Sequence, residues 1–129
     1  MSNVRRLRMR THQLRRVVAR RFFELLGDSA SPTRAVVEFA APVRERGSVD
    51  FVCFYRISGL SCAGTRKAMG VDAVQALFLA LTNAASILYT SDEYKSGRLL
   101  FLQGKNLALP AFSNTFAELI PTPKDSFTV

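Results

Sequence analysis

Residues 73–89 contain no charged side chain, no glycine and no proline, and this stretch constrains the fold most strongly. Asp72 precedes it and can accept hydrogen bonds from the free amides of a first helical turn, while Gln75 completes a pair typical of a capping box. The pattern predicts a helix of about five turns. A helix with so narrow a polar stripe is expected either in the core of its own domain or against a second chain. The core is the default, because the remaining segments are strands that need a cover.

Runs of β-branched and aromatic residues predict strands at residues 17–26, 34–39, 49–58, 65–69 and 98–103. Residues 49–58 are apolar on both sides, which predicts a central strand covered on both faces. Residues 98–103 are expected to pair beside it, residues 43–50 to form a charged connection and residues 90–97 a turn. The predicted fold is α+β, with an antiparallel sheet of four to five strands packed on one long, mostly apolar helix.

The start of the chain allows two interpretations. A helical spacing connects Val4, Leu7, Leu14, Val18, Phe22 and Leu25, whereas residues 17–26 alone alternate as a strand. We favour the strand, because residues 34–39 offer it a hairpin partner. The chain then divides into a basic arm (1–16), a single α+β domain (17–120) and a flexible tail (121–129), with one or two helical turns expected over residues 114–120.

The net charge of +8 comes from the first 21 residues, which hold eight arginines and no acid. The other 108 residues hold ten basic and ten acidic side chains, since 18 − 8 leaves ten of the former. A cationic segment of this kind indicates an anionic partner. The candidate contact residues are the arginines of the arm and two side chains of a polar corner, namely Arg5, Arg6, Arg8, Arg10, Arg15, Arg16, Lys95 and Arg98.

Groups that support catalysis are scarce. His12, the single histidine, lies in the arm, and Glu24 and Glu38 are expected to form salt bridges with neighbouring arginines across a hairpin. Two cysteines and one distant histidine are too few for a metal site, and no segment has the spacing of a glycine-rich phosphate loop. We expect no enzymatic activity, no cofactor and no metal.

Cys53 and Cys62 are expected to be free thiols in a reducing cytoplasm. Cys62 lies near Arg66 and Lys67 in the sequence, and nearby positive charge would lower the pKa of its thiol. No stretch reaches the roughly 18 uninterrupted apolar residues of a membrane span, and the basic arm lacks the apolar segment of a secretory signal. The arm shares its arginines with mitochondrial presequences but contains only one serine, Ser2.

The chain contains the blocks YRISGL at residues 55–60, GVDAVQALFLAL at 70–81 and LYTSDEYKSGRLLFL at 88–102. These blocks resemble a family of short bacterial proteins of unknown function, and the resemblance covers residues 17–105. It implies a small α+β domain of bacterial origin and brings no activity with it. The basic arm lies outside the resemblance.

Two functions of different class follow from these observations. The small size, the scarcity of catalytic groups and the apolar helix favour a non-enzymatic protein-binding module, whose partner is a second copy or another protein. Bacterial immunity proteins, which occlude a cognate toxin, are one example. The alternative is a non-specific nucleic-acid-binding protein that uses the arginines of the arm to displace counterions from phosphates.

Overall fold

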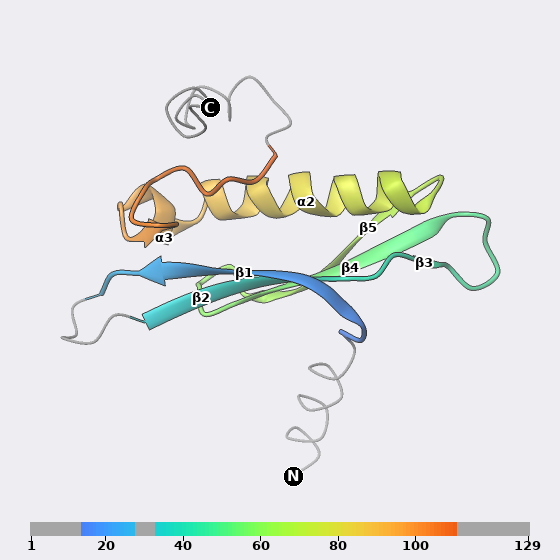
Figure 1. Cartoon of the computed structure of the whole chain (residues 1–129), viewed down its shortest axis with the longest axis horizontal. Coiled ribbons are helices and arrows are strands. Elements are labelled where there is room, and N and C mark those ends of the chain that lie inside the picture. The colour runs from blue at the N-terminus through green and yellow to red at the C-terminus, as the bar shows by residue number, and fades with distance from the viewer. Residues whose placement is uncertain (1–13, 28–32, 111–129) are drawn as a thin grey trace, which may run out of the picture.

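The computed structural model describes residues 14–27 and 33–110, which form a helix layer on a sheet layer (Figure 1). The helix α2 (Ala73–Tyr89) lies across one face of the sheet, and a short helix, α3 (Asp92–Lys95), follows it. The strands are β1 (Val17–Leu25), β2 (Thr33–Ala40), β3 (Val43–Arg44), β4 (Phe51–Ser58), β5 (Gly64–Gly70) and β6 (Leu99–Leu100). The predicted α+β class is confirmed.

β4 is the strand that connects most of the sheet. β5 pairs with it antiparallel along residues 51–57, so β2 and β3 share its other edge, because a strand has only two edges. β1 pairs with β2, and β6 pairs with the end of β1. The sheet therefore has six strands, one more than predicted. The additional strand is β3, whose two residues extend the pairing of β4 within a segment that we expected to be a connection only.

The hairpin of β1 and β2 settles the two interpretations of the N-terminal segment for the described residues. Residues 17–25 form a strand paired with residues 33–40, so the helical interpretation is wrong there. The pairing continues just before β1, where the Arg16 carbonyl accepts a hydrogen bond from the Ala41 amide at 3.0 Å. Residues 1–13 lie outside the described residues, as do the helical turns expected at 114–120 and the tail 121–129.

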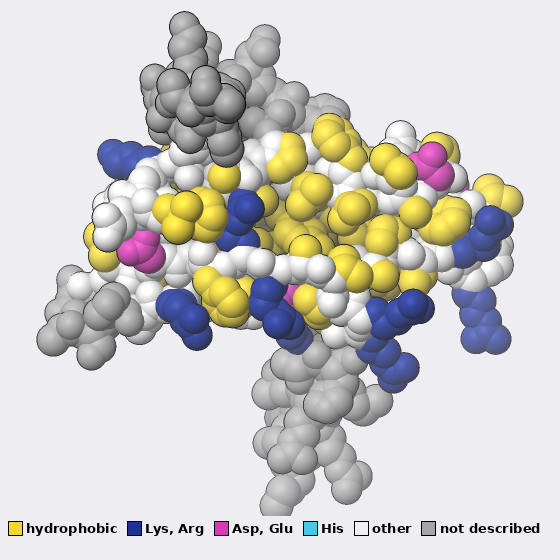
Figure 2. Space-filling view, in the orientation of Figure 1, with side chains coloured by type: hydrophobic (Ala, Val, Ile, Leu, Met, Phe, Trp, Pro, Cys, Tyr) yellow, Lys and Arg dark blue, Asp and Glu magenta, His cyan; other side chains and the backbone are white. Residues whose placement is uncertain are grey.

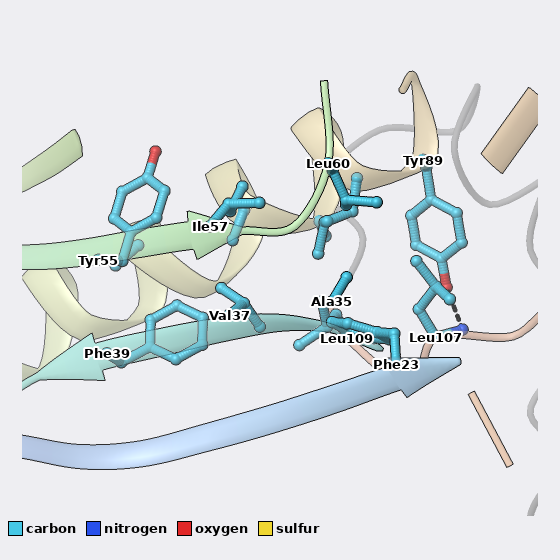
Figure 3. Close-up of a cluster of buried hydrophobic side chains, with 14 of the residues drawn as sticks. Phe23, Ala35, Val37, Phe39, Tyr55, Ile57, Leu60, Tyr89, Leu107 and Leu109 are labelled. Atoms are coloured by element: carbon cyan, nitrogen blue, oxygen red, sulfur yellow. Dashed lines mark hydrogen bonds between the residues drawn. The ribbon is translucent and has the colours of Figure 1, made fainter. Parts of the chain in front are cut away.

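The core lies between α2 and the sheet face beneath it (Figure 3). On that face β1, β2 and β4 contribute large side chains that are at most 2% exposed, including Phe23, Val37, Phe39, Tyr55 and Ile57. The opposite side of β4 carries the half-buried residues Phe54 and Arg56. Val52 on this same side is 3% exposed, so the second face of β4 is covered in part, although α2 lies on the other side of the sheet.

The region after α2 differs from the prediction in two ways. Residues 92–95 form a helical turn rather than an irregular turn, because the Ser91 hydroxyl caps it by accepting from the Tyr94 amide at 3.2 Å. Only Leu99 and Leu100 of the predicted strand 98–103 are extended, and they pair with β1 at the sheet edge instead of with the central strand. The strand stops because two hydrogen bonds between Phe101 and Gly104 close a tight turn.

Candidate binding surfaces

α2 packs on the sheet through small side chains. Ala76, Ala80 and Ala84 are 0% exposed, and a Cβ placed on Gly70 would lie 2.5 Å from the backbone nitrogen of Ala76. Larger side chains on this face would hold the helix away from the sheet. The predicted cap also forms, since Asp72 accepts from the Gln75 amide at 2.8 Å. The core interpretation of α2 is thus confirmed for its alanine face.

Three large apolar side chains at the start of α2 and just before it are exposed to solvent. Val74 and Phe78 are four residues apart and share one helix face, and Val71 directly precedes the N-cap Asp72. Val71, Val74 and Phe78 are 71%, 77% and 46% exposed. We call these three residues the open stripe. Figure 2 shows hydrophobic side chains gathered over the helix layer and several Lys and Arg side chains along the sheet layer.

The same helix face is covered further along α2. Thr82, Ala85 and Tyr89 continue the spacing of the open stripe, and each is 1% exposed. Figure 1 shows the chain after β6 running back along this half of the helix. The Tyr89 hydroxyl accepts a hydrogen bond from the Leu107 amide at 2.8 Å. One face of α2 is therefore covered over its C-terminal half and exposed over its N-terminal half.

Arg21 holds this covering segment against β1. Its Nη1 donates to the carbonyls of Leu107 at 3.0 Å and Ala108 at 2.6 Å. Its guanidinium also lies 4.4 Å from the centroid of the Phe101 ring. Although Arg21 is close to the arm in sequence, it is part of the folded domain and has a structural role there.

The sheet face opposite α2, which we call the outer face, carries a row of charges across three strands. Arg20, Glu38 and Arg56 are neighbours in the strand register. Glu38 forms salt bridges with Arg20 at 3.1 Å and with Arg56 at 2.8 Å. Burial alone would raise the pKa of Glu38, but hydrogen bonds and charge from Arg56 and then Arg20 more than offset it and hold that pKa below its ordinary value. The expectation of arginine salt bridges is confirmed for Glu38, whereas the Glu24 carboxylate accepts a hydrogen bond from the Gln103 amide at 2.6 Å.

Two more cations share the outer face. The Arg34 guanidinium lies over the Phe22 ring at 4.5 Å from its centroid, and Phe22 is 46% exposed. Lys67 of β5 is opposite Phe54 in the register, and its amino group is 3.6 Å from Glu45. The outer face therefore combines basic side chains with an exposed aromatic ring.

The structure separates the candidate contact residues predicted from the sequence. Arg15 and Arg16 are exposed just before β1, whereas Arg5, Arg6, Arg8 and Arg10 lie outside the described residues. Lys95 and Arg98 are also exposed. They lie near the opposite end of β1, since the neighbouring Leu99 pairs with Leu25, the last residue of that strand. A nine-residue strand spans about 30 Å, so the pair Arg15 and Arg16 and the pair Lys95 and Arg98 do not form a single surface.

The polar corner of Lys95 and Arg98 is built around a buried carboxylate. Glu93 accepts from the Ser61 amide at 2.8 Å and from the Ser61 hydroxyl at 2.9 Å. Burial would raise the pKa of Glu93, but the Ser61 hydrogen bonds more than offset it and lower that pKa. These contacts tie α3 to the turn between β4 and β5. Both carboxylate oxygens of Glu93 therefore take part in hydrogen bonds that stabilise the fold.

Cys62 lies in a shallow pocket beside this corner, together with Ser61, Ile87, Thr90, Ser91 and Asp92. Burial, followed by the charge of Glu93, raises the pKa of its thiol. The expected lowering of the Cys62 pKa was therefore wrong, because desolvation outweighs the nearby arginine. Cys53 is also a free thiol, and burial raises its pKa to about 11.

Within residues 14–27 and 33–110, no three His, Cys, Asp or Glu side chains are placed to hold a metal ion. No helix in these ranges is long and apolar enough to cross a membrane.

Sequence reasoning missed Arg20, Arg34, Arg56 and Lys67 as members of one surface. The signal was present in part, because alternation along β1 places Arg20 and Phe22 on one side of the strand. The neighbours on β2, β4 and β5 depend on strand register, which residue patterns alone left undetermined.

The fold and its surfaces define a small α+β domain with one long helix on an antiparallel sheet. The chain belongs to the family described as Domain of unknown function (DUF6968), whose model matches residues 19–111. The expectation of an uncharacterised family is thereby confirmed. The match begins within β1, so the arm precedes it. No curated protein and no solved structure matches the chain.

Proposed function

We propose that this protein is a non-enzymatic protein-binding module that contacts its partner through the open stripe. The observation that carries the proposal is the exposure of Val71, just before α2, and of Val74 and Phe78 on this helix, which has no charged residue. Contiguous apolar surface is unfavourable in water and is typical of interaction sites. Contact with a partner would remove this surface from water, as residues 105–110 already do for the other half of α2.

The partner is expected to present an apolar contact surface without charge at its centre. A charge buried against the open stripe would lose its hydration, α2 itself has no charged residue, and the neighbouring Asp72 already accepts from the Gln75 amide. A cognate toxin occluded by an immunity protein is one such partner, and a second copy of this chain is another. Either partner would meet the requirement for an apolar contact surface.

Photo-crosslinking tests this proposal. A photoreactive residue placed at position 74 in cells of the native host should yield an adduct with one protein, which mass spectrometry identifies. The matched control is position 49, because Val49 is 76% exposed and Val74 is 77% exposed. An adduct of the same protein at both positions, or at neither, would contradict the proposal.

The purified partner then provides a quantitative measurement. We expect Val71→Gln with Val74→Gln to weaken its binding by about tenfold or more, since the two changes remove central apolar contacts. Val49→Gln with Leu102→Gln replaces equally exposed apolar side chains elsewhere and should leave the affinity unchanged. Inhibition of the partner's toxicity, lost in the first variant only, would support the immunity form. Concentration-dependent sedimentation of the pure protein would support the homo-oligomer.

A further inference from the structure

We infer that the outer face of the sheet is a nucleic-acid-binding surface. One of its strands, β1, begins directly after the arm. The inference is independent of the open stripe, because α2 lies on the other side of the sheet. It assigns phosphate contacts to Arg20, Arg34 and Lys67, which the sequence did not single out.

The acids of this face do not cancel its positive charge. Glu38 is shared by Arg20 and Arg56, so these three side chains together keep one positive charge. Glu45 lies 3.6 Å from Lys67 and balances its charge, and Arg34 adds a second net positive charge. Arg20 uses Nε and Nη2 for Glu38, and its side chain is 50% exposed. A guanidinium has five N–H donors, so N–H groups remain for a phosphate oxygen. Glu38 thus holds the Arg20 guanidinium in place while leaving it accessible to a phosphate group.

Arg34 and Phe22 add a flat surface on which a base can stack. The guanidinium lies 4.5 Å from the ring centroid, and the ring is 46% exposed. Aromatic rings and arginine planes are the usual stacking partners of bases in single strands. The same pair disfavours insertion into a lipid surface, because burial of Phe22 would carry the charge of Arg34 with it.

The basic residues also follow a line of suitable length. The chain from Arg16 to Phe22 runs along β1 for about 20 Å, long enough to lie beside several nucleotides of a single strand. Arg15 and Arg16 lie at one end of this line, and the Arg34–Phe22 pair lies towards the other. A bound strand would therefore meet several cations in succession.

Fluorescence anisotropy with a labelled single-stranded oligonucleotide over a series of salt concentrations tests the inference. We expect Arg34→Gln with Lys67→Gln in the full chain to reduce the slope of log affinity against log salt by about 1.4, at about 0.7 for each lost phosphate contact. The comparison variant, Lys95→Gln with Arg98→Gln, removes the same charge from the polar corner around Glu93 and should keep the wild-type slope. Thermal unfolding checks that both variants are folded.

A separate variant tests the stacking contact without changing the charge. Phe22→Leu should weaken single-strand binding by about tenfold, whereas Val18→Leu, at a 60% exposed position on the same strand, should leave it unchanged. Equal slope changes in the two charge variants, a larger change in the Lys95 and Arg98 variant, or no change in either would overturn the inference. Binding to vesicles of anionic phospholipid in preference to the oligonucleotide would also overturn it.

Discussion

At the scale of single residues, small side chains and shared charges decide how closely the layers approach. Gly70 and Ala76 let the start of α2 lie directly on β5. Glu38 is 8% exposed, and its salt bridges with Arg20 and Arg56 offset the cost of burying its charge.

Gly70→Ala is expected to lower the free energy of unfolding by about 1–3 kcal/mol. The added methyl group would lie 2.5 Å from the Ala76 nitrogen, so the helix start must move. Denaturant unfolding measures the effect. Gly104→Ala is the control, because its added methyl group would lie 3.6 Å from the Phe101 carbonyl oxygen, an ordinary contact distance. Equal losses in both variants would argue against close packing as the cause.

Acid should remove the contribution of Glu38 to stability. Its pKa is lowered in the folded state, so the stabilisation is complete above the ordinary value of 4.5 and is lost as the pH falls through the folded-state pKa. We expect Glu38→Gln to cost about 1–3 kcal/mol at neutral pH and to show a shallower loss of stability below pH 4.5. Chemical denaturation at a series of pH values measures both effects. Parallel pH curves for the variant and the wild type would contradict this account.

At the scale of elements, the segment after β6 completes the core without forming regular structure. Leu107 is 0% exposed, and this segment is held by side chains from β1 and α2. Because the segment is attached to both β1 and α2, it covers the C-terminal half of one α2 face.

Arg21→Met tests the attachment of this segment. The variant keeps most of the side-chain length but loses two hydrogen bonds to carbonyls, which should cost about 1–3 kcal/mol. Hydrogen exchange of residues 105–110 should accelerate more than that of β4. Arg15→Met, an exposed change before β1, should alter neither quantity. Unchanged exchange in Arg21→Met would show that apolar packing alone holds the segment.

At the scale of the whole molecule, two different surfaces lie on opposite sides of two layers. The open stripe is apolar and belongs to α2, whereas the outer face is basic and belongs to the sheet. Residues on these surfaces share no partner among the contacts described, so the two proposed interactions are expected to be independent.

Combining the open-stripe variant (Val71→Gln, Val74→Gln) with the outer-face variant (Arg34→Gln, Lys67→Gln) tests this independence. The changes in unfolding free energy should add to within about 0.5 kcal/mol, because distant sites behave additively. Each pair should affect only its own ligand, as titration of partner and oligonucleotide would show. A shift of oligonucleotide affinity by the open-stripe variant would reveal coupling between the layers.

Much of the fold could be predicted because its signals are local. The cap at Asp72 and the uncharged residues after it specify α2 by themselves. The prediction failed at residues 98–103, where apolar character suggested a longer strand. There the Phe101–Gly104 turn ends the strand, and the pairing partner is β1.

The sequence by itself determined the α2 helix and the main strands, because capping and periodicity act between neighbours along the chain. Only the tertiary structure decided that Ala76, Ala80 and Ala84 bring α2 close to the sheet, that part of α2 stays uncovered, and that Arg20, Arg34, Arg56 and Lys67 share one face. Those outcomes depend on layer spacing and strand register, which arise from contacts between residues far apart in sequence.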